Sequence, residues 1–191
     1  MGGTLYIYYI YIYIYIYYIQ DLGDTARDAA LQSSEGPPMC FKRSGCAVAV
    51  LENGGGGGVC VGGLYVFGGF SGSQAIPYVE VLSFGGGGWR EVSMMQSARY
   101  SAAALALPGS GAIPDAGEGG GRVAVFGGFD GEKILSSVEI FTAEGDAACS
   151  GGLGRWIHGV DMPKARMACA YCAYRGRAVL LGGKISRKYS I

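Results

Sequence analysis

Residues 64–70, LYVFGGF, and residues 123–129, VAVFGGF, are two copies of one pattern, a short apolar run that ends in two glycines. A third copy, AVLLGG, occupies residues 178–183. The three glycine pairs are 59 and 55 residues apart and begin at Gly68, Gly127 and Gly182. Self-similarity at a period of this size indicates a repeat architecture, in which each copy is one supersecondary unit.

Other residues keep the same register as the glycines. A glutamate within an apolar run, YVEVL or SVEIF, lies eleven residues after the second glycine in two copies. A tryptophan precedes a methionine by six residues twice, and a methionine precedes an arginine by four residues three times. Several residue types in one fixed order make a strong signal. These landmarks are Glu80 and Glu139, Trp89 and Trp156, Met39, Met95 and Met162, and Arg43, Arg99 and Arg166.

The residue types themselves favour β strands. Short apolar runs such as GCAVAVL and YVEVL suit strands that are buried on both faces. The chain has 36 glycines and 6 prolines without a period of three, so the glycines belong to turns and loops. Glycine pairs end the runs where the backbone turns sharply or approaches a neighbour. We therefore predict an all-β chain.

The repeat gives a strand order within each copy. We expect inner strands at about 45–51, 99–107 and 167–174, second strands at about 63–69, 122–128 and 177–182, third strands near 78–83 and 137–142, and outer strands near 88–92 and 155–158. These make two complete units and the beginning of a third. Trp89 and Trp156 are expected to fill space between units.

This order of landmarks resembles the kelch repeat over residues 39–191. The resemblance implies an all-β fold, an incomplete kelch-type β-propeller of four-stranded antiparallel blades around a channel. In place of the tyrosine that the family has after V-E-V, this chain has Leu82 and Phe141, which keep the apolar packing but lose a hydroxyl bond. Arg43, Arg99 and Arg166 are expected to build the blades, because they recur with the repeat.

Two blades and part of a third do not close a propeller, which needs about four to eight. We expect either a piece of a longer gene product or a protein that completes its ring by self-association with further copies. Of these two alternatives, the sequence favours the piece of a longer product.

Residues 1–19 differ from the rest, since residues 5–19 consist of tyrosine, isoleucine and one leucine. The tract is shorter than the ~20 residues that cross a bilayer, and no basic residue precedes it. Its strict alternation would make a strand with isoleucine on one face and tyrosine on the other. We favour a simpler explanation, in which the tract is a translated TATATA repeat of the DNA that was attached to the chain by a wrong start site. Residues 20–38 are expected to be a polar linker with one helical turn after Asp24.

Charge and cysteine content exclude several classes. Lysine plus arginine equals aspartate plus glutamate at 15 each, which disfavours a nucleic-acid partner. The six cysteines show no framework of a small secreted domain, so we expect free thiols and a cytoplasmic location. We also expect no membrane partner, because the Tyr/Ile tract is too short to span a bilayer. In a strand, the C-x-x-C at Cys169 and Cys172 would place its thiols on opposite faces.

We expect no catalysis, metal or cofactor in this chain. His158 is the single histidine, too few for a copper site and without a G-x-S-x-G partner for a hydrolase triad. The glycine runs lack the strand, helix and lysine of a phosphate loop. The structural repeat positions are Gly68, Gly69, Trp89, Arg99, Gly127, Gly128, Trp156, Arg166, Gly182 and Gly183.

The kelch resemblance implies a protein-interaction module, an adaptor or scaffold that binds protein partners through the loops at one end of the propeller. The alternative is a fragment of a larger kelch-containing enzyme or ubiquitin-ligase adaptor whose activity lies outside this chain. The loop residues expected to contact a partner are Phe70, Ser71, Ser73, Gln74, Gln96, Ser97, Phe129, Asp130, Glu132, Lys133 and Lys164.

Overall fold

The structure is a computed structural model that describes residues 15–18, 32–51, 62–107, 121–143, 153–175 and 177–186. The chain divides into two compact units, Met1–Pro38 and Met39–Ile191. Every regular element in the described residues is a β strand, as predicted. None of those residues forms a helix long and apolar enough to cross a membrane.

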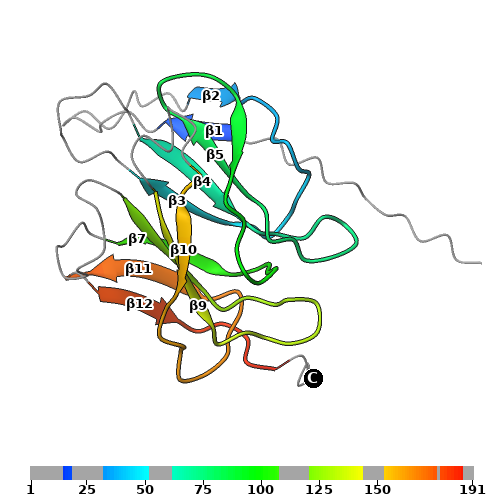
Figure 1. The fold of residues 1–191 in the computed structure, drawn as a ribbon, viewed down its shortest axis with the longest axis vertical. Helices are drawn as coiled ribbons and strands as arrows, with labels where there is room; N and C mark the ends of the chain where they lie inside the picture. Colours follow the sequence, from blue (N-terminus) through cyan, green and yellow to red (C-terminus); the bar gives the residue numbers. More distant parts are fainter. Residues whose placement is uncertain are drawn as a thin grey trace, which may run out of the picture. The chain divides into compact units, whose positions relative to one another are not determined.

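The strands of the second unit form three antiparallel sheets (Figure 1). The first sheet contains β3 (Ala47–Leu51), β4 (Gly63–Phe67), β5 (Val79–Ser83) and β6 (Trp89–Val92). The second contains β7 (Ala103–Leu107), β8 (Arg122–Phe126), β9 (Val138–Thr142) and β10 (Arg155–His158). The third contains β11 (Ala170–Tyr174) and β12 (Arg177–Leu181). In each sheet the strands are neighbours in chain order.

The same register recurs in the sheets. Glu80 on β5 lies opposite Val66 on β4, and Glu139 on β9 lies opposite Val125 on β8. Because side chains alternate along a strand, each glutamate shares a face with the residue two positions further on, Leu82 or Phe141. The two complete sheets are therefore equivalent position by position.

Aromatic side chains join the first two sheets. The ring of Phe141 on β9 lies 5.5 Å from that of Tyr65 and 6.1 Å from that of Phe67, both on β4. Trp156 on β10 meets Phe67 edge to face at 5.9 Å. These rings belong to one apolar cluster, so the largest core of the described chain lies between two sheets, where Trp156 was predicted.

The inner strands follow one another through the unit. β3 lies against β7, and β7 lies against β11, as Figure 1 shows for the three strands. Hydrogen bonds repeat at each step: Ser101 N–H donates to Gly45 O at 2.7 Å, and Ala168 N–H donates to Ser101 O at 2.8 Å. Successive copies are thus placed by the same contacts.

All predicted strand positions contain a strand, but the inner strands begin later than expected. Residues 45, 101 and 168, which precede β3, β7 and β11, have φ values of +58°, +52° and +51°. A left-handed residue interrupts the extended backbone. The segments before these residues make only isolated bridges, such as Ser44 with Phe70 and Tyr100 with Phe129.

The first unit contains two short strands, β1 (Tyr15–Tyr18) and β2 (Gln32–Glu35), which pair antiparallel. Residues 32–35, within the segment expected to be a polar linker, supply backbone partners to a strand of the Tyr/Ile tract. Tyrosine and isoleucine both favour the extended conformation. The helical turn expected after Asp24 lies outside the described residues.

Candidate functional site

Arg99, just before β7, ties together the strands of the second sheet. Its Nη1 donates to the carbonyl oxygens of Gly127 at 2.9 Å and Ser137 at 3.1 Å. Its Nη2 forms an ion pair with Glu139 Oε1 at 2.6 Å. Both charged side chains are buried. A buried charge is tolerated when it is paired and hydrogen-bonded in this way.

The turn that precedes Arg99 completes the coordination of Glu139. Gln96 N–H donates to Oε2 at 2.7 Å and Ser97 N–H donates to Oε1 at 3.0 Å. Both carboxylate oxygens therefore accept charge-assisted hydrogen bonds. We call this arrangement the carboxylate socket: the arginine of M-x-x-x-R together with backbone N–H groups of the residues just after the methionine.

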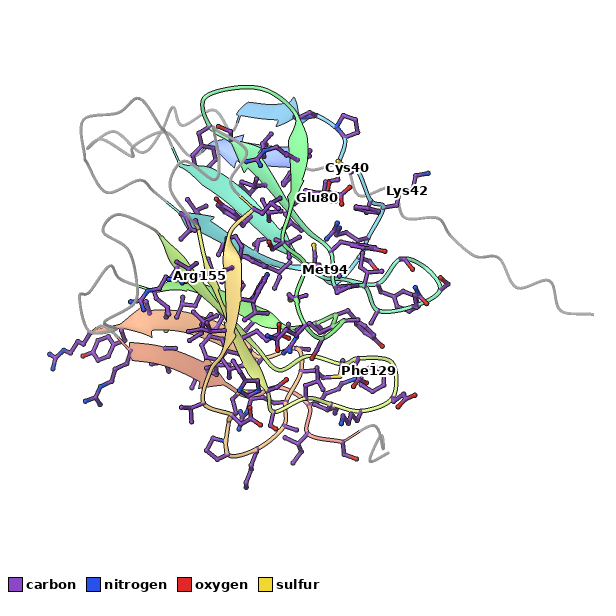
Figure 2. The ribbon with its side chains drawn as sticks, in the orientation of Figure 1. Cys40, Lys42, Glu80, Met94, Phe129 and Arg155 are labelled. Carbon is purple, nitrogen blue, oxygen red and sulfur yellow. The ribbon has the colours of Figure 1, made fainter. Side chains whose placement is uncertain are left out.

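The first sheet repeats the socket. Arg43 Nη1 donates to the carbonyl oxygens of Gly68 at 2.9 Å and Tyr78 at 2.8 Å, and Arg43 Nη2 pairs with Glu80. Cys40 N–H donates to Glu80 Oε1 at 2.6 Å. Figure 2 shows Cys40 and Glu80 side by side. In both complete sheets, a strand of the chain itself delivers the carboxylate.

The third sheet has the socket without its carboxylate. Arg166 Nη1 donates to Gly182 O at 2.7 Å, as its equivalents do to Gly68 and Gly127. In the described part of the chain, however, no acidic side chain pairs with Arg166. The described part of the third sheet consists of β11 and β12, so no strand equivalent to β5 or β9 is among the described residues.

A pocket of ≈ 400 Å³ lies at this socket and is lined by Met162, Pro163, Lys164, Arg166 and Leu180. Leu180 lies two residues before Gly182. In the complete sheets the residue at this position is Val66 or Val125, and it lies opposite the glutamate. The lining contains two cationic residues and no acidic one. The pocket therefore lies beside the residue of β12 that corresponds to Val66 and Val125.

The surroundings of the first glycine of each pair also differ between the two complete sheets and the third sheet. A Cβ on Gly68 would stand 2.3 Å from Arg99 O, and a Cβ on Gly127 would stand 2.2 Å from Arg166 O. These oxygens belong to the next copy along the chain. A Cβ on Gly182 would meet nothing within 4 Å. The side of the third sheet that corresponds to these two contacts is open in the described structure.

Apolar residues surround this opening. Leu181 on β12 is 61% exposed and Ile185 is 65% exposed. Tyr171 on β11 is also exposed in part, and the partial burial of its phenol raises its pKa. β12 has one neighbouring strand in the described residues, whereas its equivalents β4 and β8 have two. An unpaired edge of this kind accepts an added strand.

The loops predicted to contact a partner are held rigidly. Asp130 Oδ1 accepts the N–H groups of Glu132 and Lys133, each at 2.8 Å. Burial opposes ionisation of Asp130, but these N–H donors bring its pKa below the usual value. In the equivalent loop, Ser71 Oγ accepts the N–H of Gln74 at 3.2 Å. Both loops are therefore preorganised by their first polar side chain.

The structure separates the predicted loop residues by exposure. Phe129, labelled in Figure 2, is only 4% exposed and packs against Tyr100 with ring centres 5.5 Å apart. Phe70 also contacts Tyr100, with ring centres 5.4 Å apart, and is partly exposed. Ser97 and Asp130 are partly exposed. The remaining predicted residues are exposed, namely Ser71, Ser73, Gln74, Gln96, Glu132, Lys133 and Lys164.

The structure brings only part of the predicted set together. Lys164 lines the pocket and Gln96 and Ser97 build the filled socket of the second sheet, while the 71–74 and 130–133 turns are separate local structures. Sequence reasoning named Arg166 only as a structural position and did not find the pocket. The signal for Arg166 was its M-x-x-x-R spacing, which it shares with Arg43 and Arg99.

Other candidate groups are local. His158 ends β10, with its Nε2 3.5 Å from an Asp161 carboxylate oxygen, and both side chains are exposed. Burial raises the pKa of the Cys46 thiol. The pKa of the Cys40 thiol is raised first by its hydrogen bond with Glu80 and then by burial. A raised thiol pKa lowers the thiolate fraction and hence reactivity.

Comparison with known proteins leaves the chain without a match: no family model matches it, and neither does any curated protein.

Proposed function

We propose that this chain is a protein-binding module, an adaptor or scaffold without chemistry of its own, built from kelch-like repeats that form blades of a β-propeller. The succession of β3, β7 and β11 supports the propeller arrangement, since each copy is placed on the preceding one by the same contacts. The residue spacing that resembles the kelch repeat supports the family.

One observation supports the binding role. Two loops that follow the glycine pairs present exposed polar side chains on turns fixed by their own hydrogen bonds: Ser71 Oγ accepts the N–H of Gln74, and Asp130 Oδ1 accepts the N–H groups of Glu132 and Lys133. Short ordered loops on a scaffold of strands are a common place for the recognition of a partner.

The test uses two exposed cationic residues, Lys133 on the loop after the second glycine pair and Arg175 in the turn between β11 and β12. The full chain, immobilised, is incubated with cell extract, and retained proteins are quantified by mass spectrometry. We expect a defined set of proteins that Lys133→Glu loses and Arg175→Glu keeps, because only Lys133 lies on the loops that we propose bind a partner. Sedimentation of the pure chain identifies any second copy among the partners.

The proposal fails if the wild-type chain retains nothing that is specific and does not self-associate. It also fails if both variants retain the same proteins as the wild type, since the loop that carries Lys133 would then have no part in binding.

A further inference from the structure

We propose that Arg99 is a positioning residue of the partner-binding surface: its side chain is fixed in the second sheet, while its backbone closes the loop of the first sheet that carries Ser71 and Gln74. This inference rests on the proposed binding role and identifies what holds one of the proposed loops in place. It predicts that a change inside the second sheet alters a loop of the first sheet.

The loop between β4 and β5 is closed at its base by the backbone of Arg99. Gly69 N–H donates to Arg99 O at 2.9 Å, and Arg99 N–H donates to Ile76 O at 3.4 Å. Ile76 N–H also donates to Gly69 O at 2.9 Å, so the two ends of the loop and Arg99 form one hydrogen-bonded group. The approach is close, because a Cβ on Gly68 would stand 2.3 Å from Arg99 O.

The loop between β8 and β9 has the same closure. Gly128 N–H donates to Arg166 O at 3.0 Å, and Arg166 N–H donates to Leu135 O at 3.1 Å. Leu135 N–H donates to Gly128 O at 2.9 Å. In both loops the closing residue is the arginine of the next copy along the chain. A contact that recurs at equivalent positions belongs to the repeat rather than to one loop.

The side chain of Arg99 is held in the second sheet. It donates to Gly127 O at 2.9 Å and to both the carbonyl and the hydroxyl oxygen of Ser137 at 3.1 Å, and it pairs with Glu139. Arg99 is fully buried, where hydrogen bonds and ion pairs are stronger than in water. These contacts fix the position of Arg99, and with it the two backbone groups that close the first loop.

Arg99 and Tyr100 together link the two loops. Tyr100 exchanges two backbone hydrogen bonds with Phe129, at 3.0 and 2.9 Å, whereas the backbone of Arg99 bonds to the loop of the first sheet. The ring of Tyr100 lies 5.4 Å from that of Phe70 and 5.5 Å from that of Phe129. The anchored Arg99 side chain therefore holds the segment to which both loops are attached.

A purely local role for the pair of Arg99 and Glu139 makes the opposite prediction. Glu139 lies on β9, which follows the second loop, so loss of the pair would loosen Gly128 and that loop first. If the backbone of Arg99 transmits the loss, Gly69 is affected first instead. The N–H groups of Gly69 and Gly128 donate equivalent bonds, so their hydrogen exchange separates the two cases.

The test follows amide hydrogen exchange by NMR in the full chain and in two variants. Glu139→Gln removes the counter-charge of Arg99, and Ser137→Ala removes one bond from Arg99 Nη2. We expect exchange at Gly69 to accelerate by about ten-fold or more in Glu139→Gln and by about three-fold or more in Ser137→Ala. In each variant the acceleration at Gly69 should exceed that at Gly128 by about three-fold or more.

Ser136→Ala is the matched control. The Ser136 hydroxyl bonds to Asp161 Oδ2, at 3.4 Å, instead of accepting a bond from Arg99. This variant should leave exchange at both glycines within about two-fold of the wild type. Ser137→Ala retains the ion pair, so the test does not depend on the folding of Glu139→Gln.

Equal acceleration at the two glycines in Ser137→Ala overturns the inference, as does a larger acceleration at Gly128. Exchange at Gly69 that stays as slow as in the wild type overturns it too. If the Lys133-dependent capture of proteins persists in those cases, the binding role stands and only the positioning role is wrong. Faster exchange at Gly69 without any capture shows the reverse: Arg99 positions the loop, and the binding role is wrong.

Discussion

Gly127 and Gly182 have the same backbone conformation in different surroundings. Their φ values are +57° and +67°, in the left-handed region where a Cβ is unfavourable. A Cβ on Gly127 would also stand 2.2 Å from Arg166 O and 2.8 Å from Met162 Cε, whereas one on Gly182 would meet nothing within 4 Å. The first glycine of a pair therefore serves both the turn and the contact with the next copy.

Gly182→Ala is expected to cost about 1–2 kcal/mol in the free energy of unfolding, the penalty of the left-handed conformation alone. Gly127→Ala should cost about 1–3 kcal/mol more, because the backbone of the next copy has to move. Urea denaturation of both variants measures the difference. Equal losses would mean that Gly127 does not lie in contact with the next copy.

The buried pair of Arg99 and Glu139 supports the second sheet and gives a second residue-scale prediction. Glu139→Gln leaves the buried guanidinium without a counter-charge, and we expect a loss of about 3–5 kcal/mol. Glu132→Gln, on an exposed loop, should change the free energy of unfolding by less than about 0.5 kcal/mol. A loss at Glu139 no larger than that at Glu132 would show that the pair is not buried.

At the scale of the elements, the aromatic contact between sheets determines whether the copies fold together. Phe141 is fully buried on β9 and contacts two rings of β4. Such a residue connects the stability of one sheet to that of the next. Ile157 on β10, at 42% exposed, has no comparable position.

Phe141→Ala is expected to destabilise the chain by about 3–5 kcal/mol. It should also change the fluorescence of Trp156, whose ring lies 5.2 Å from that of Phe141. Ile157→Ala serves as the matched control, with an expected loss of about 1 kcal/mol. If the two substitutions cost the same and leave the tryptophan emission unchanged, the sheets do not pack through these rings.

Sequence reasoning located the centres of the strands because apolar runs and glycine pairs are local signals. It placed the starts of two inner strands too early because Ser101 and Ala168 adopt left-handed conformations without the glycine that normally indicates them. It missed β2, because QSSE has no strand propensity of its own and is ordered by its partner. The socket around Arg166 was not predicted, because it is recognised only by comparing its contacts with those of the filled sockets around Arg43 and Arg99.

At the scale of the whole molecule, the second unit consists of copies in different states of completion. The first two sheets have four strands, a filled socket and a buried interface, while the third has two described strands, an open socket and exposed apolar residues. Stability should therefore be uneven along the chain.

Hydrogen exchange of the full chain tests this account most directly, because backbone amides in buried, doubly paired strands open far less often than those at a free edge. We predict slow exchange in residues 63–67 and 122–126, and fast exchange in the equivalent residues 177–181. Uniform exchange across these three segments, either fast or slow, would contradict the account of equivalent sheets with one open edge.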